Sequence, residues 1–256
     1  MKIKLLYFWA TSVLLAVATG CSHNDIAPED DTKPGTEETE TKGVSFIAGN
    51  ESTRTSLNYD TSNFYWEDGD KIYVKDDKST FHCSSNSVSE KVLKFKFRMP
   101  GTYTKNSYTV YYPGKNGTEN KVTIASSQTQ NGPDNTLHFG TVGDCGTGKA
   151  NLQNGQYRFT LVHSPAYLCF KPIYDHPLAD TYVTKIEVTA DKNIAGDYTL
   201  KEDGTLTGTG SSKTITLTPK DGSSNKGFKM VNDAKKENCA SGRMFMVIMP
   251  GTYVLT

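Results

Sequence analysis

The residues that could do chemistry in this chain are few and scattered. Its five histidines show no H-x-x-x-H or H-E-x-x-H spacing: His23, His82, His138, His163 and His176. A zinc site on a helix needs such a spacing, because residues four apart lie on one helical face. The chain also lacks G-x-S-x-G and C-x-x-C. We therefore predict no catalytic residue and no metal site, and we do not expect an enzyme.

Two segments come close to known ligand-binding loops. GDCGTGKA (143–150) has the glycines and the lysine of a phosphate-binding loop, but Ala150 replaces the hydroxyl that would hold Mg²⁺. DKNIAGDYTLKE (191–202) has the spacing of a calcium loop, but Ala195 occupies its fifth position and the flanks have strand patterns. We interpret the first segment as a glycine-rich linker and the second as part of a hairpin between 183–190 and 197–204, and we predict no cofactor.

The composition argues against a nucleic-acid partner. Lys and Arg together number 28, as do Asp and Glu, so the formal net charge is zero. A protein that binds nucleic acid usually carries a basic patch or stripe that attracts phosphates.

The first 20 residues are typical of an export signal. Lys2 and Lys4 precede an apolar run over 5–18, which is shorter than the ~18 residues of a membrane-spanning helix. Cys21 follows Ala-Thr-Gly directly, and this spacing resembles the lipobox of bacterial lipoproteins. The resemblance implies lipidation at Cys21 and anchoring to a membrane. The alternative is ordinary signal cleavage at Ala18 or Gly20, which leaves a free thiol.

Residues 21–42 differ from the rest of the chain. They are rich in Asp and Glu and contain no aromatic residue, so they offer too little apolar surface to offset the entropy of ordering. We expect a flexible acidic tether here.

Beyond residue 42 the pattern predicts an all-β fold. Alternating apolar and polar residues recur in short segments bounded by Gly, Pro, Asn and Asp, as expected for half-buried strands in β-sandwiches. The segments are 44–49, 64–77, 93–99, 108–114, 121–127, 157–163, 166–173, 183–190, 197–206, 213–219 and 244–256. Because 139–155 is polar and glycine-rich, we place a boundary there. The expected domains are 43–150 and 151–256.

The last predicted strand runs to Thr256 without a polar tail. We expect the C-terminal domain to be incomplete. Truncation is favoured, and a strand borrowed from elsewhere is the alternative.

Several motifs in the folded part resemble fimbrillin-like lipoproteins, the subunits of type V pili. VSFIAG (44–49), Thr53-Arg54-Thr55 and WEDGDKIYV (66–74) match the N-terminal pattern of that family. YTVYYPG (108–114), SSQTQNG (126–132) and FTLVHSPAYLCFKPI (159–173) follow in the family's order. The resemblance covers most of 44–256 and implies two transthyretin-like β-sandwiches.

The resemblance also implies a way of assembling. Family members are exported to the outer membrane as lipoproteins, and an arginine-directed protease then removes the first strand. A strand of another subunit fills the groove, so the chain joins a fimbrium. Arg54 lies where this cut would fall, which leaves Thr55 as the new first residue. We therefore expect residues 44–49 to be held only provisionally.

Two alternatives remain open at this point. Arg54 is an exposed arginine beside Glu51 if no protease cuts there. If the 14 tyrosines form a binding surface, the protein is instead a surface lipoprotein that binds a glycan or host ligand and does not polymerise.

Overall fold

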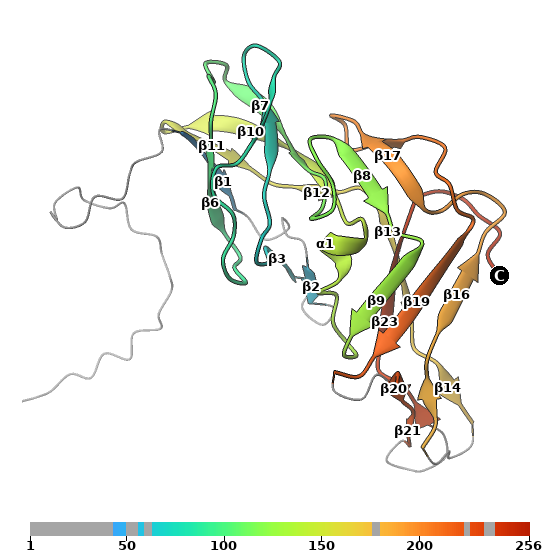
Figure 1. The fold of residues 1–256 in the computed structure, drawn as a ribbon. Helices are drawn as coiled ribbons and strands as arrows, with labels where there is room; N and C mark the ends of the chain where they lie inside the picture. The colour runs from blue at the N-terminus through green and yellow to red at the C-terminus, as the bar shows by residue number, and fades with distance from the viewer. Residues whose placement is uncertain (1–42, 50–55, 59–62, 176–179, 223–225, 233–238) are drawn as a thin grey trace, which may run out of the picture. The chain divides into compact units, whose positions relative to one another are not determined.

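The structure is a computed structural model that describes residues 43–49, 56–58, 63–175, 180–222, 226–232 and 239–256. These residues form short β-strands joined by turns and loops, together with the helix α1 (Phe139–Val142) (Figure 1). The all-β fold class predicted from the sequence is confirmed.

Eight strands form the largest sheet. Its order is β5-β4-β7-β10-β11-β1-β6, and β12 pairs with β10. The bounds are β1 (Val44–Ala48), β4 (Tyr73–Lys75), β5 (Phe81–Cys83), β6 (Phe95–Met99), β7 (Ser107–Tyr112), β10 (Gly146–Gln153), β11 (Gln156–Phe159) and β12 (Val162–His163).

Residues that follow β5 close this sheet against β6. The Asn86 side chain donates from Nδ2 to the Lys96 carbonyl at 2.9 Å and accepts the Arg98 N–H at 2.7 Å. The Ser85 N–H donates to the Arg98 carbonyl at 2.8 Å. An open strand edge can pair with another chain. Here the outer edge of β6 is satisfied within the molecule, and the sheet is nearly closed.

Aromatic side chains fill the inside of this sheet. Trp66 is fully buried, with its ring centroid 5.0 Å from that of Phe97 and 5.7 Å from that of Tyr112. The alternation along each strand places one set of side chains inside and leaves the other set outside. The buried members of this first core are Phe46, Ala48, Trp66, Ile72, Val74, Val88, Phe97, Met99, Tyr103, Tyr108, Val110, Tyr112, Ala150, Tyr157, Phe159 and Leu161.

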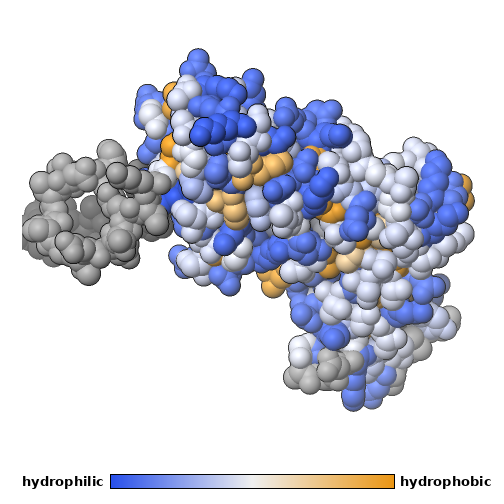
Figure 2. All heavy atoms as spheres, turned by 45° about the horizontal axis from the view of Figure 1, so that its top comes forward, coloured by the Kyte–Doolittle hydropathy of each residue, from blue (hydrophilic) through white to orange (hydrophobic). Residues whose placement is uncertain are grey.

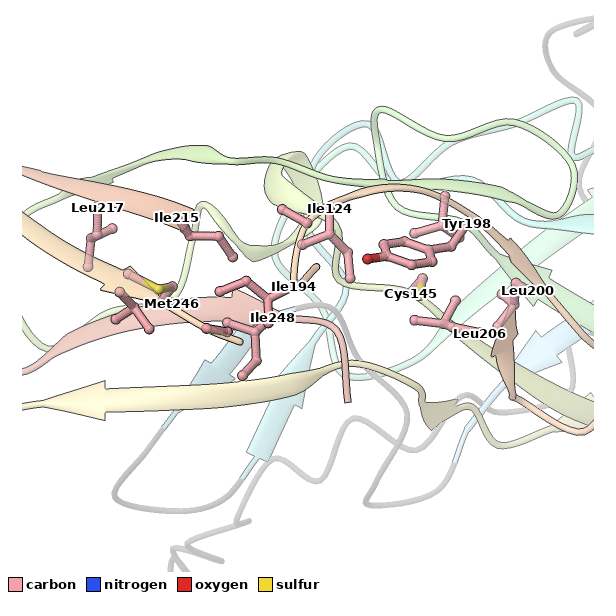
Figure 3. Close-up of a cluster of buried hydrophobic side chains, with 14 of the residues drawn as sticks. Ile124, Cys145, Ile194, Tyr198, Leu200, Leu206, Ile215, Leu217, Met246 and Ile248 are labelled. Atoms are coloured by element: carbon pink, nitrogen blue, oxygen red, sulfur yellow. The ribbon is translucent and has the colours of Figure 1, made fainter. Parts of the chain in front are cut away.

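The remaining strands form smaller sheets. The three-stranded sheets are β16-β19-β9, β18-β17-β8 and β14-β22-β21, and the pairs are β13-β23, β15-β20 and β2-β3. Their bounds are β2 (Ser56–Asn58), β3 (Asn63–Tyr65), β8 (Lys121–Ile124), β9 (Ser127–Asn131), β13 (Ala166–Phe170), β14 (Ile173–Tyr174), β15 (Tyr182–Val183), β16 (Ile186–Thr189), β17 (Gly196–Leu200), β18 (Leu206–Thr207), β19 (Thr214–Lys220), β20 (Phe228–Lys229), β21 (Val231–Asn232), β22 (Cys239–Ala240) and β23 (Met244–Ile248). Aliphatic side chains from several of these sheets meet in a second core (Figure 3).

The glycine-rich segment 139–155 is not a linker. It contains α1 and β10, and β10 pairs with β7 from Gly146 opposite Tyr112 to Asn151 opposite Ser107. The expected boundary after residue 150 therefore falls inside a strand. In addition, β8 pairs with β17 and β9 pairs with β19. Strands from each expected domain thus complete sheets of the other.

The hairpin expected between 183–190 and 197–204 does not form. β16 pairs with β19, whereas β17 pairs with β18 and β8. Local turn residues suggested that neighbouring strands pair with each other, but longer-range pairings prevail.

Buried glutamines join β9 to β23. Gln128 accepts the Val247 N–H at 2.9 Å and donates to the Val247 carbonyl at 2.7 Å, and Gln130 accepts the Phe245 N–H at 2.8 Å. Both glutamines are at most 1% exposed. We call the contact between β9 and β23 the seam. Along it, side-chain amides form the hydrogen bonds to backbone N–H and C=O groups that a neighbouring strand forms in a sheet.

The last residues run beside β16. Thr256 and Thr189 exchange two backbone hydrogen bonds, at 2.8 and 2.9 Å, and Leu255 lies opposite Ala190. The expectation that the C-terminal domain is incomplete stays a prediction.

Candidate functional site: the slot that holds β1

The sequence singled out Cys21, Arg54 and Thr55, and all three lie outside the described residues. Lipidation and proteolytic processing therefore stay predictions. The structure does describe β1, the strand that precedes Arg54 in the chain, together with the strands around it.

β1 occupies a slot between two other strands. It pairs antiparallel with β6 from Val44 opposite Met99 to Ala48 opposite Phe95. On its other side it pairs parallel with β11 from Phe46 opposite Tyr157 to Ala48 opposite Phe159. The Gly49 N–H extends this second ladder by donating to the Phe159 carbonyl at 3.3 Å.

Phe46 anchors β1 in the first core. Its side chain is fully buried, and its ring stacks on Tyr157 with centroids 4.7 Å apart and planes 17° apart. The Tyr103 ring meets it edge-on at 5.2 Å. Buried aromatic pairs contribute about 0.5–1.5 kcal/mol beyond the area they bury, so Phe46 is the main side-chain contact of this strand.

Ala48 lies where two aromatic side chains close over the strand. It is fully buried between Phe95 on β6 and Phe159 on β11. The rings of Phe97 and Phe159, which belong to the strands on either side of β1, have centroids only 6.4 Å apart. A small side chain at position 48 leaves room for this approach.

The expectation that residues 44–49 are held only provisionally is wrong for the intact chain. β1 is paired on both sides, and its inward side chains Phe46 and Ala48 are buried. The sequence pattern gave the inward and outward faces of the strand, but it could not give the number of its neighbours. Removal of β1 would expose two strand edges and an apolar groove.

In the structure, both segments that resemble ligand loops make close contacts with other parts of the backbone. In 143–150, a Cβ on Gly148 would lie 2.2 Å from the Thr160 carbonyl, so this glycine allows close backbone approach. In 191–202, Asp191 accepts the Val254 N–H at 3.0 Å and Asn193 donates to the Thr209 carbonyl at 2.9 Å. Among the described residues no group of three His, Cys, Asp or Glu side chains could hold a metal ion.

A buried polar cluster lies where α1 leads into β10. Asp144 is fully buried, and its Oδ1 accepts from His163 Nδ1 at 2.8 Å and from the Tyr167 hydroxyl at 2.5 Å. Burial, together with the Asp144 charge, raises the pKa of Tyr167 well above its ordinary value. Tyr167 also stacks on Phe139 at 4.7 Å. Because Tyr167 is held as a neutral hydrogen-bond donor, we assign this cluster to structure.

Trp66 and Asp70 both have structural roles in the fold. Asp70 is fully buried and accepts the Tyr112 hydroxyl at 2.9 Å and the Glu67 N–H at 2.7 Å. The carboxylate thus fixes the turn that follows Trp66.

Six tyrosines in the described part of the chain belong to the cores and are not exposed to a ligand. Tyr103, Tyr108, Tyr111, Tyr112, Tyr157 and Tyr198 are buried. On the face drawn in Figure 2, hydrophobic groups form small patches between hydrophilic ones. A hollow of about 420 Å³ is lined by Ser107, Tyr108, Thr109, Lys149, Glu202 and Asp203. This hollow is polar, with both signs of charge.

Comparison of this chain with protein-family models, with curated proteins and with solved structures finds no match. Among the described residues, no helix is both long and apolar enough to cross a membrane.

The sequence missed the residues that line the slot. Phe95, Phe97, Tyr157 and Phe159 were recognised as members of strands but not as a group. The alternation F-K-F on one strand and Y-R-F on the other was the available signal, because it puts two aromatic side chains on one face of each strand. That both faces meet β1 depends on the sheet order.

Proposed function

We propose that this protein is an exported surface lipoprotein that acts as a structural fimbrial subunit or accessory tip protein. In this proposal, proteolysis after Arg54 separates β1 from the rest of the chain, and a strand of another subunit takes its place. The observation that carries the proposal is the position of β1, between β6 and β11 in a nearly closed sheet.

The position of β1 is one that a strand of another chain could occupy if β1 were removed. Without β1, the facing N–H and C=O groups of β6 and β11 lose their strand partners and form two open edges that can pair with an incoming strand. The groove would also expose the aromatic side chains that now contact Phe46 and Ala48. An incoming strand restores both kinds of contact, which is how β-strand addition gains its affinity.

Proteolysis and assembly can be tested together. N-terminal sequencing of the surface form should give Thr55, and assembled material should run as ladders in SDS that collapse on boiling. Arg54→Gln should abolish both results, whereas Arg243→Lys, far from the slot in the chain, should change neither. Ladders that persist in Arg54→Gln would contradict assembly by this cut.

The anchor is tested separately. We propose that Cys21 is lipidated after export, on the strength of the signal-like residues 1–20 and the spacing before the cysteine. Cys21→Ser should release the unprocessed protein from membranes into the soluble fraction. Continued membrane association of this variant would remove the lipoprotein assignment.

A second candidate is a surface lipoprotein that binds a glycan or host ligand. Its support is the polar hollow, whose hydroxyl, ammonium and carboxylate groups suit the hydroxyls of a sugar. On a glycan array this function predicts a signal that Lys149→Ala weakens and Lys185→Ala leaves unchanged. A monomer that keeps Cys21 and gives such a signal would favour this candidate over assembly.

A further inference from the structure

We propose that the slot selects its incoming strand by a pair of side chains: an aromatic residue followed two positions later by a small one. This inference rests on the proposed function, and it specifies the partner. The partner is an extended segment of another chain that runs in the direction of β1, antiparallel to β6 and parallel to β11.

The aromatic position is set by the row of residues at Phe46. Phe97 on β6 and Tyr157 on β11 lie directly opposite Phe46 on its two sides. All three side chains are at most 2% exposed, and the stacked Phe46–Tyr157 pair is joined by the Tyr103 ring. Loss of the ring at this position would leave a cavity with aromatic walls, which a smaller side chain cannot fill.

The small position is set by the next inward row. Phe95 and Phe159 lie opposite Ala48. Phe97 and Phe159 belong to the strands on either side of β1, and their ring centroids are 6.4 Å apart. The Phe95 and Phe97 rings are themselves 4.8 Å apart, edge to face. A larger side chain at this position would have to displace several packed rings at once, and cores of this kind resist such overpacking.

The two rows together fix the register of the incoming strand. A slip of one residue would turn the inward side chains outward. A slip of two residues would bring the aromatic side chain into the row built around Ala48. Only one alignment places the aromatic side chain and the small side chain each in the row that fits it. The pair therefore fixes the register of the incoming strand as well as contributing to its binding.

The described strands other than β1 do not carry this pair when the small residue is limited to Ala, Gly or Ser. After residue 54, an aromatic residue followed two positions later by Ala, Gly or Ser occurs only at Tyr112-Pro113-Gly114. Tyr112 is already buried in the first core, and Pro113 has no N–H to donate to a ladder. The strand that replaces β1 is therefore not one of the other strands described here.

Peptide exchange tests the inference on the full chain after a single cut at Arg54. If that bond resists, a sequence-specific protease site placed between residues 51 and 55 gives the same nick. The nicked protein is incubated with a fluorescent peptide of residues 41–52, and binding is followed by anisotropy. Two variant peptides are compared with it. One carries Phe46→Ala together with Ala48→Phe, which exchanges the pair, and the other carries Ile47→Val, which changes an outward residue.

We expect the native peptide to bind saturably, the Ile47→Val peptide to bind within about threefold of it, and the exchanged peptide to bind at least ~100-fold more weakly. Equal binding of the native and exchanged peptides would overturn the inference while leaving strand replacement intact. If no peptide enters a nicked chain that has released β1 and stays folded, the proposed function itself fails.

A measurement on the intact chain needs no cut. Ala48→Phe should lower the thermal midpoint by about 5 °C, because the added ring overpacks a row that is already filled. Ile47→Phe, which adds similar bulk on the outward side of the same strand, should have a clearly smaller effect. Equal effects of the two variants would show that the small position is not restrictive.

Discussion

At the scale of single residues, buried polar groups decide how this protein responds to its surroundings. His138 is 8% exposed, and its Nε2 lies 2.9 Å from the Phe245 carbonyl. Its Nδ1 is buried with no hydrogen-bond partner in the described part of the chain. A neutral imidazole that donates from Nε2 fits this environment, whereas a charged one would leave a buried N–H without an acceptor.

His138 makes stability depend on pH. Burial lowers the pKa of His138 from 6.5 to about 4. The unfolded chain therefore binds the proton first, and stability that is complete above pH 6.5 is lost as the pH falls towards 4. The loss amounts to about 3 kcal/mol. Urea unfolding of the wild type should show this slope and His138→Gln should not. The same slope in both proteins would assign it to other groups.

Gly148 offers a second test at this scale. Gly148→Ala should destabilise the fold by several kcal/mol, on the order of other overpacking changes, because its Cβ would lie 2.2 Å from the Thr160 carbonyl. Gly222→Ala is the matched control, since no atom lies within 4 Å of a Cβ there. Chemical denaturation of both variants measures the difference. Similar stabilities would mean that β10 and the Thr160 backbone separate at little cost.

At the scale of elements, the seam between β9 and β23 shows side chains in the place of a backbone ladder. Three backbone atoms of β23 form hydrogen bonds with the buried side chains of Gln128 and Gln130. They are the Phe245 nitrogen, the Val247 nitrogen and the Val247 oxygen. The apolar strand β23 is buried at every position, so it has no water to replace a lost glutamine. The seam is therefore as sensitive to substitution as the cores beside it.

Substitution of Gln128 tests that sensitivity. Gln128→Met keeps the volume but removes the partners of the Val247 N–H and C=O, and it should destabilise the fold by about 3 kcal/mol. Gln153→Met, at an exposed end of β10, should change stability by about 0.5 kcal/mol or less. Urea midpoints measure both. A Gln128→Met midpoint equal to that of the wild type would show that β23 finds other partners.

At the scale of the whole described chain, the two halves of the sequence depend on each other. β8 and β9 leave the first half to pair with β17 and β19, while β11 and β12 return from the second half to the largest sheet. A cut at the boundary suggested by composition would divide β10 and remove strands from both cores.

Fragments test this dependence. Residues 43–150 and 151–256 expressed separately should lack cooperative unfolding, because each loses strands that complete its sheets. Co-expression of the two fragments should restore a cooperative transition in circular dichroism. Cooperative melting of either fragment alone would contradict the exchange of strands that the structure shows.

The sequence by itself determined the strands and their inward faces. VSFIA, FKFRM and SYTVYY place apolar residues at every second position, and all three are strands whose inward residues are buried or half-buried. Glu67-Asp68-Gly69-Asp70 marks a turn, and the structure places a turn there. These features depend on neighbours within a few residues, which a single sequence records directly.

Only the tertiary structure decided which strands pair. β1 lies between β6 and β11, about 50 and 110 residues away along the chain, and Gly148 is needed for close approach rather than for a flexible linker. Alternation specifies that one face of a strand is buried, but many partners can satisfy it equally well. The choice of partner depends on how the aromatic side chains of distant strands fill one shared core. This packing involves residues far apart in the chain, so no local sequence pattern records it.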